Sequence, residues 1–339
     1  MAEASSTCST RDDEAETLIN ERLLAPPDLE MVAMGRVGID LYPEQIGVPL
    51  AEVRTFAKSL GGSPTNVAVA SARLGRRTAL ITRVGDDGFG TYVRQALEAF
   101  GVWPGWVITD PRYHTPVVFA EIHPPDHFPM LFYREPKAPD AGLVPGDFDA
   151  VVVEKVPLLW STGQALASES SRSTTLGAMA SRRRDNITVL DIDHRPGLWD
   201  DPDEERRWVR QAISFATVVV GNLDEVELAV GERDPRSAAR ALLQLGPDLA
   251  VIKQGLRGAY AQQKDGLSAL VPSVPVHTLC GLGAGDAFGG ALAHGLLAGW
   301  ELEPMLRFAN AAGALVASRL ACADAMPTPD EISELLANV

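Results

Sequence analysis

The sequence predicts an α/β fold in which helices cover both faces of one mostly parallel, doubly wound sheet. Short apolar runs alternate with longer helical patterns along most of the chain, as they do in proteins of this class. A length of 339 residues allows one large domain or two smaller ones, and no linker long enough to divide the chain is visible. We therefore expect a single domain over 29–339, and we interpret the polar, acidic stretch 1–28 as a flexible leader.

The expected elements follow from apolar runs and from the residues that interrupt them. A first strand is expected at 31–34, and a helix begins at Ser63 and ends by Gly75. Ser63 is a candidate cap because Pro64, which suits the first helical position, follows it. Residues 38–56 are mixed and broken by proline and glycine, which suits an excursion from the main sheet. The later expected strands are 78–84, 117–122, 130–133, 150–153, 158–162, 187–192, 216–220, 250–253 and 258–262, and the clearest later helices are 88–100, 284–298, 302–320 and 328–336.

Composition narrows the class of partner. A net charge of −15 argues against nucleic acid or an anionic membrane surface as a partner, although a nucleotide needs only a local pocket. Cys8, Cys280 and Cys322 are too few for a disulfide framework and fit a reducing compartment. No apolar stretch approaches the length of a membrane span, and the N-terminus lacks the apolar core of a signal peptide. We expect a cytoplasmic protein.

The segment 281–288 carries the strongest chemical signal. Its small residues run into Asp286 at the start of an apolar helix, where free N–H groups and the helix dipole favour an anion. We expect the N–H groups of Gly283, Ala284 and Gly285 to bind a phosphate and Asp286 to take a proton from an attacking hydroxyl. The segment matches neither a dinucleotide fingerprint nor a Walker A loop.

A second glycine-rich segment extends this signal. Gly61-Gly62-Ser63-Pro64-Thr65-Asn66-Val67-Ala68 is followed at fixed spacing by Gly75 and Gly85, and this pattern resembles the N-terminal signature of the ribokinase (PfkB) family of small-molecule kinases. The segment 281–288 resembles the C-terminal signature of that family, and the resemblance covers about 30–335. It implies a three-layer, ribokinase-like sheet, a small β lid formed from about 38–56 and 112–135, ATP as the phosphoryl donor and a requirement for Mg²⁺.

The resemblance also implies where the nucleotide and the metal bind. Asn222 and Glu225 match an Asn-x-x-Glu motif whose glutamate organises Mg²⁺, usually through water; the alternative is a helix cap with an acidic first turn. Lys253 precedes Gly255 and Gly258 at an expected nucleotide edge, although a lysine at a strand end is often only a solvated charge.

Asn310 lies on the penultimate helix, where the resemblance implies the adenine pocket. On the acceptor side, the resemblance assigns sugar hydroxyls to Asp40, which is expected at the end of a strand extension, and to Gly62 and Asn66. For Asn66 the alternative is a helix cap.

Four further segments resemble one subfamily, the 5-dehydro-2-deoxygluconokinases of inositol catabolism: 35–42, 132–135, 191–199 and 318–328. A sugar-acid substrate needs a cationic partner, and Arg36, Arg134 and Arg195 are the candidates, although each could instead form a structural ion pair. Departures from the expected pattern at 136–137, His194 and 280–282 leave the acceptor open, so 2-keto-3-deoxygluconate, fructose, ribose or a nucleoside stay as alternatives.

Other properties are less constrained by the sequence. A non-catalytic sugar or nucleotide sensor on the same fold is the alternative from another class. An exposed edge at 115–134 favours a homodimer formed through the lid. Backbone carbonyls near 280–286 and 316–324 could also bind K⁺.

Overall fold

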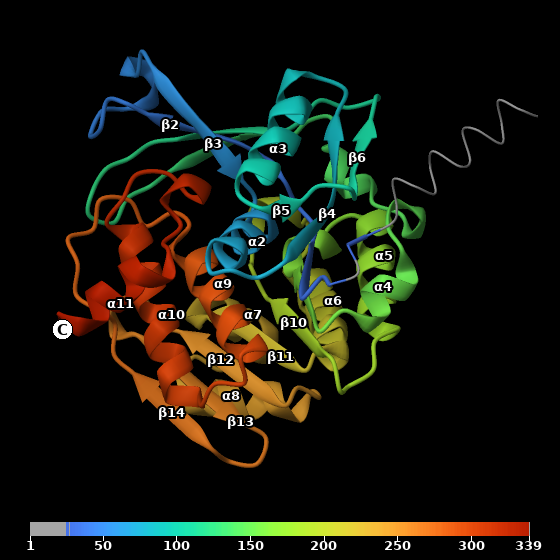
Figure 1. Cartoon of the computed structure of the whole chain (residues 1–339), viewed down its shortest axis with the longest axis vertical. Coiled ribbons are helices and arrows are strands. Elements are labelled where there is room, and N and C mark those ends of the chain that lie inside the picture. Colours follow the sequence, from blue (N-terminus) through green and yellow to red (C-terminus); the bar gives the residue numbers. More distant parts are fainter. Residues whose placement is uncertain (1–24, 27, 339) are drawn as a thin grey trace, which may run out of the picture.

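The computed structural model describes residues 25–26 and 28–338 (Figure 1). Residues 1–24 and 27, which make up most of the expected leader and include Cys8, lie outside the described part, as does Val339. Within the described residues, no helix is long and apolar enough to cross a membrane.

The main sheet has ten strands in the order β14-β13-β12-β11-β10-β9-β1-β4-β5, with β6 paired to β4 beyond that path. Every neighbouring pair is parallel except β12–β13 and β13–β14, which are antiparallel. This arrangement confirms the predicted mostly parallel α/β sheet. The strands are β1 Met31–Met34, β4 Thr78–Gly85, β5 Val102–Trp103, β6 Val107–Asp110, β9 Leu158–Thr162, β10 Ile187–Asp191, β11 Val218–Asn222, β12 Leu249–Lys253, β13 Ala259–Gln263 and β14 Ser268–Val271.

Helices cover both faces of this sheet, and the alternation of side chains along β1 shows why. Met31 and Ala33 pack into one hydrophobic core, and Val32 and Met34 pack into the other, because successive strand residues point to opposite faces. The first core takes α2 Ser63–Arg73, α3 Gly88–Ala99, α9 Ala284–Leu297, α10 Leu302–Ala317 and α11 Pro329–Ala337; the second takes α4 Ala150–Lys155, α5 Glu169–Ala180, α6 Pro202–Phe215, α7 Leu223–Val230 and α8 Pro235–Gln244.

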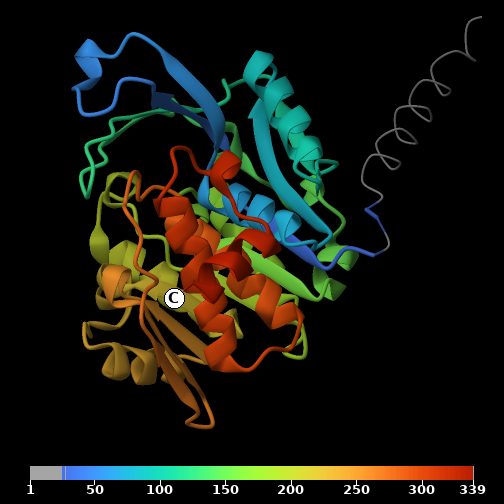
Figure 2. The same cartoon turned by 60° about the vertical axis from the view of Figure 1, so that its left-hand side comes forward.

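A separate four-stranded sheet has the order β3-β2-β7-β8. It consists of β2 Gly38–Pro43, β3 Phe56–Gly61, β7 Val117–Ala120 and β8 Met130–Tyr133, and its blue and green ribbons extend beyond the helical layers (Figure 2). The segments 38–56 and 112–135, interpreted from the sequence as a lid, supply three of these strands, and β3 continues past the first segment.

Two sequence predictions about local structure are wrong. Residues 150–153 form the start of α4 rather than a strand, because the Asp149 side chain accepts hydrogen bonds from the N–H groups of Val151 and Val152 and caps a helix. A short run of β-branched residues does not distinguish the two structures by periodicity. The cap of α2 is Gly62, at φ 98°, and not Ser63. A Cβ at Gly62 would lie 2.4 Å from the carbonyl oxygen of Arg36, so this close approach requires glycine.

Candidate active site

The candidate site lies where the carboxyl ends of β10, β11 and β12 meet the first turns of α2 and α9. A cavity of about 360 Å³ opens there, and residues of the four-stranded sheet line its other side. Ligands of open α/β sheets bind at this edge, outside the carboxyl ends of the parallel strands. A second cavity, of about 430 Å³, lies beside it and shares four lining residues: Lys253, Gly255, Gly281 and Gly285. The two cavities therefore meet at the start of α9.

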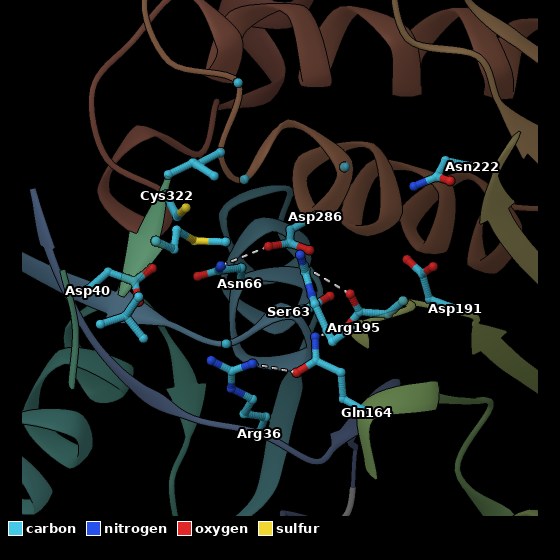
Figure 3. A pocket seen from close by; sticks show the side chains of 18 of the residues that line it. Arg36, Asp40, Ser63, Asn66, Gln164, Asp191, Arg195, Asn222, Asp286 and Cys322 are labelled. Atoms are coloured by element: carbon cyan, nitrogen blue, oxygen red, sulfur yellow. Dashed lines mark hydrogen bonds and ion pairs between the residues drawn. The ribbon is translucent and has the colours of Figure 1, made fainter. Parts of the chain in front are cut away.

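Asp286 lies in the first turn of α9 and lines the first cavity (Figure 3). Desolvation raises the pKa of its carboxyl group to about 7, and the nearby carboxylates of Asp193 and Asp191 add to the rise. Hydrogen bonds from Asn66 and Ser63 oppose the rise, and the Asn66 bond spans 2.8 Å from Nδ2 to Oδ2. A carboxylate with a pKa near neutrality is well matched to accept a proton from a hydroxyl at physiological pH.

The backbone before Asp286 forms the turn that the sequence predicts as an anion site. Gly283 is the N-cap of α9 at φ 81°, and a Cβ there would lie 2.7 Å from Cys322 Sγ. Ala287 is the first residue of α9 whose N–H group reaches back along the helix, 2.9 Å to Gly283 O, so helix geometry leaves the earlier N–H groups without that bond. The Ala284 N–H group makes a long bond of 3.4 Å to Gly281 O. Gly285 is thus the best placed of the three expected donors.

Lys253 is the centre of a charged cluster at the ends of three neighbouring strands. Its Nζ lies 3.1 and 3.2 Å from the two carboxylate oxygens of Asp191 and 3.9 Å from Glu225 Oε2. Burial alone would lower the pKa of Lys253, but these carboxylates raise it above its ordinary value, so the lysine is charged. The side chain is 17% exposed and paired, so it is not a solvated charge.

Asn222 and Glu225 form a capping box at the start of α7. Asn222 Oδ1 accepts from the N–H groups of Asp224 and Glu225, and Glu225 Oε2 accepts from the Asn222 N–H group at 2.5 Å. The alternative of a helix cap is therefore present, and both residues also line the first cavity. Burial raises the pKa of Glu225 to about 7, against the opposing effect of Lys253.

These residues fit a Mg²⁺ ion that is held mainly by water and substrate phosphates. Among the residues that the structure describes, no group of three or more acidic, histidine or cysteine side chains is arranged to hold a metal. Mg²⁺ usually keeps several waters and takes only one or two protein carboxylates together with substrate phosphates. Glu225 lines the cavity with one carboxylate oxygen already used in the cap, so it fits that role, directly or through water.

A chain of polar side chains crosses the end of the cavity where the sequence predicts the acceptor (Figure 3). Arg36 Nη1 donates to Gln164 Oε1 at 2.7 Å, and Gln164 Nε2 donates to Asp193. Asp193 Oδ1 is 3.0 Å from Arg195 Nη2. Arg36 and Arg195 are therefore brought together in the cavity. Arg134 does not line this cavity. It pairs with Asp140 at 2.5 Å and lines neighbouring hollows, so it forms the structural ion pair that was the alternative.

Asp40, Gly62 and Asn66 line the same cavity. Asp40 is inside β2 rather than at a strand end, and its carboxylate lies so close over Gly61 that a Cβ there would be 2.0 Å from Oδ1. Burial raises the pKa of Asp40 to about 6, and Arg36 partly offsets the rise. Asn66 is inside α2 and donates to Asp286, so its side chain is not a helix cap.

The second cavity has a different lining. Apolar side chains such as those of Val274, Val276 and Phe288 line it, together with the backbone of Gly255 and Gly258. Asn310 lines it from α10 and donates through Nδ2 to the carbonyl groups of Val271 and Pro272, at 3.2 and 3.0 Å. The Asn310 Oδ1 oxygen is then the acceptor that this side chain offers to a ligand.

Sequence reasoning missed four polar residues of the site: Ser63, Gln164, Asp191 and Asp193. Asp191 ends β10, and Gln164 and Asp193 follow β9 and β10 within two residues. A polar residue just after a buried strand, at the edge where the expected nucleotide residues also lie, is the signal that indicates them. For Ser63 the sequence indicates only a helix cap.

Comparison with known proteins agrees with this geometry. Residues 28–329 match the model of the pfkB family carbohydrate kinases. The chain is 33% identical over 317 residues to a 5-dehydro-2-deoxygluconokinase of Geobacillus thermodenitrificans, covering 92% of this chain and 94% of that protein.

Two solved structures have the same fold. A fructokinase double mutant of Vibrio cholerae, with fructose, ADP and potassium bound, has a TM-score of 0.80 at 26% identity and covers 92% of this chain and 100% of that one. The aminoimidazole riboside kinase of Salmonella enterica, complexed with aminoimidazole riboside and an ATP analogue, has a TM-score of 0.76 at 25% identity over 91% and 99%. The family resemblance is confirmed: this chain belongs to the pfkB family of carbohydrate kinases, which are phosphotransferases that act on a sugar hydroxyl.

Proposed function

We propose that the protein transfers the γ-phosphoryl group of ATP to the 6-hydroxyl of 5-dehydro-2-deoxygluconate, as part of inositol catabolism. The observation that carries the proposal is the meeting of a charged cavity and an apolar cavity at Gly285, with Asp286 in the next position. The curated relatives that bear the name 5-dehydro-2-deoxygluconokinase, at 30–33% identity, support the choice of acceptor.

The reaction follows from the positions of the charged groups. Asp286 accepts the proton of the acceptor hydroxyl as its oxygen bonds to the γ-phosphorus, and the bond from that phosphorus to the bridging oxygen of ADP breaks. The N–H group of Gly285 and the start of α9 stabilise the charge on the transferred group. Lys253 lines both cavities, where it would face the phosphates of a bound nucleotide.

Mg²⁺ would bind near Glu225 and neutralise charge on the phosphates when present. We further propose that Gly255, Gly258 and Asn310 hold the nucleoside.

K⁺ activation is proposed on the proximity of the two carbonyl-bearing segments, since the N–H group of Leu279 donates to Ala317 O at 2.8 Å. A comparison of rates in KCl and in NaCl tests it.

At the acceptor end, Arg36 is the proposed partner of the sugar-acid carboxylate. Its guanidinium lies in the cavity beside Asp40, and the Phe132 ring packs 4.8 Å from it. The carboxylates of Asp193, Asp286 and Glu225 raise the pKa of Arg195, so we assign this arginine to the phosphoryl-transfer end. Arg134 is left out of the acceptor site because Asp140 already neutralises it.

A substrate panel tests the proposed function. ADP release is measured with MgATP and, in turn, 5-dehydro-2-deoxygluconate, 2-keto-3-deoxygluconate, fructose and ribose. Turnover confined to the first acid supports the proposal. Turnover on another acceptor keeps the kinase and discards that acid, and binding of ATP without turnover on any of the four favours a sensor.

We also propose a cytoplasmic homodimer that pairs through the four-stranded sheet. The edge strand β8 exposes apolar side chains, with Leu131 47% and Tyr133 60% exposed, as expected of a strand that is covered in an assembly. Sedimentation of the wild type and of Leu131→Glu tests this, and a wild-type monomer at micromolar concentration would contradict it.

A further inference from the structure

Gln164 lies in a turn whose backbone is tightly packed against a neighbouring segment. It lies in the short 3₁₀ turn Gly163–Leu166 directly after β9, and the residue is only 8% exposed. A Cβ at Gly163 would come within 2.1 Å of the carbonyl oxygen of Ile192, so the turn packs directly against the backbone that leads from β10 to Asp193. The glycine is required for this approach, and the approach fixes where Gln164 stands.

Both ends of the Gln164 amide are used, and their order is determined by the partners. Arg36 can only donate and an ionised Asp193 can only accept, so Oε1 must face the arginine and Nε2 the carboxylate. Turning the amide over would oppose two donors at one end and two acceptors at the other. A glutamine, with one donor end and one acceptor end, satisfies both neighbours.

Asp193 connects Gln164 to Arg195. Its φ of 41° lies in the left-handed region that a non-glycine residue rarely adopts, and the carboxylate receives Gln164 on one oxygen and Arg195 on the other. These contacts hold the strained backbone in place. The result is a continuous link from Arg36 at the acceptor end to Arg195 at the phosphoryl-transfer end.

We propose that Gln164 is a positioning residue that sets the separation between Arg36 and Arg195, and thereby selects acceptors by the length of chain between their carboxylate and the hydroxyl that is phosphorylated. The inference rests on the proposed function, because it takes Arg36 as the carboxylate partner. Gln164 itself does not take part in bond making. It fixes two charged groups that the proposed function assigns to contacts with the reactants.

Two substitutions separate positioning from a general structural role. Gln164→Leu removes both hydrogen bonds and leaves Arg36 free to move, so the KM for the preferred acid should rise about tenfold or more, as loss of a hydrogen bond to a charged group implies. Gln164→Glu keeps an acceptor for Arg36 but opposes Asp193, so at pH 8 that KM should stay within about threefold while kcat falls. Gln211→Leu, at an exposed position on α6, is the matched control.

The experiment measures kcat and KM for hydroxy acids of five, six and seven carbons with MgATP, and the affinity for each acid by calorimetry. For Gln164→Leu we expect a higher KM for the acid and an unchanged KM for ATP. The ratio of kcat/KM between acids of different chain length should fall towards one. Equal preference ratios in wild type and Gln164→Leu, or a uniform fall in kcat at unchanged KM in Gln164→Leu, would overturn the inference. Wild-type protein that neither binds nor phosphorylates any acid would instead overturn the proposed function on which it rests.

Discussion

The two cavities that meet at Gly285 are built in different ways. The first cavity, which we propose binds the acceptor and call the acceptor cavity, is lined by charged and polar side chains that already bond to one another, such as Arg36 to Gln164 and Arg195 to Asp193. The second cavity, which we propose holds the nucleoside, is mainly apolar, and one of its few polar side chains, Asn310, has donors that are already used by the backbone. A charged, prearranged lining selects a ligand by the positions of its polar groups, whereas an apolar slot selects mainly by shape. Substitutions in the two cavities should therefore affect different ligands.

Lys253, at the boundary of both cavities, should show the largest effect. Lys253→Met leaves Asp191 and Glu225 without their cation, and loss of one partner of a buried ion pair costs about 3–5 kcal/mol. Urea unfolding at pH 7 measures the cost, which should shrink at lower pH as the two carboxylates take up protons. Lys264→Met, at an exposed position, should change stability by less than about 0.5 kcal/mol. Equal unfolding midpoints for the two variants would show that the ion pairs of Lys253 do not contribute to stability.

Arg36→Met should affect the ligand of the acceptor cavity and not the nucleotide, which we place in the second cavity. The substitution keeps much of the side-chain length and removes the charge, so the KM for the acid should rise about 10- to 100-fold, on the strength of hydrogen bonds to charged groups. The KM for ATP should stay within about twofold. Arg134→Met tests the assignment, because its partner is Asp140 and it lines other hollows. If Arg134→Met raised the acid KM more than Arg36→Met, the assignment of the carboxylate would be wrong.

Gly283→Ala acts on the turn where the cavities meet. The backbone there has φ 81°, and the new Cβ would lie 2.7 Å from Cys322 Sγ, so a loss of about 1–3 kcal/mol in stability is expected, with weaker ATP binding. Gly299→Ala is a matched control: its φ is 66°, but no atom lies within 4 Å of the added Cβ. The difference between the two variants measures the crowding against Cys322 alone. No difference would mean that the turn yields to the added atom.

Asn310→Ala should show the smallest effect and only on the nucleotide. Loss of one neutral hydrogen bond, of about 1 kcal/mol, raises the KM for ATP by about fivefold and leaves the KM for the acceptor unchanged. Steady-state titration of each substrate at saturating concentration of the other measures both values. A change confined to the acceptor would reverse the assignment of the two cavities.

The sequence predicted the parts of this site that depend on local order. The turn before Asp286, the helix after Gly62 and the strand that ends at Lys253 were all visible as glycine and apolar patterns, because backbone conformation and burial leave such marks. The small residues needed for close backbone approach also stand out in a single sequence.

Pairings between distant side chains were not predictable in the same way. Nothing near Arg134 in the sequence separates it from Arg36, yet one is neutralised by Asp140 and the other meets Gln164, 128 positions away. The short apolar run at 150–153 was misassigned because the Asp149 cap, a matter of side-chain geometry, decides between helix and strand. Such outcomes depend on how the folded chain brings its segments together.

The measurement that tests the central claim most directly is the pH dependence of kcat/KM for wild type and for Asp286→Asn, with equilibrium binding of ATP and of the acceptor to both. A base must be ionised to act, so wild-type kcat/KM should fall as the pH drops through about 7, the raised pKa of Asp286 in the unliganded protein. The variant should bind both ligands, lose about 10²–10⁴ in kcat and show no such limb. Retention of the limb and of most of the turnover in Asp286→Asn would contradict the assignment of the base.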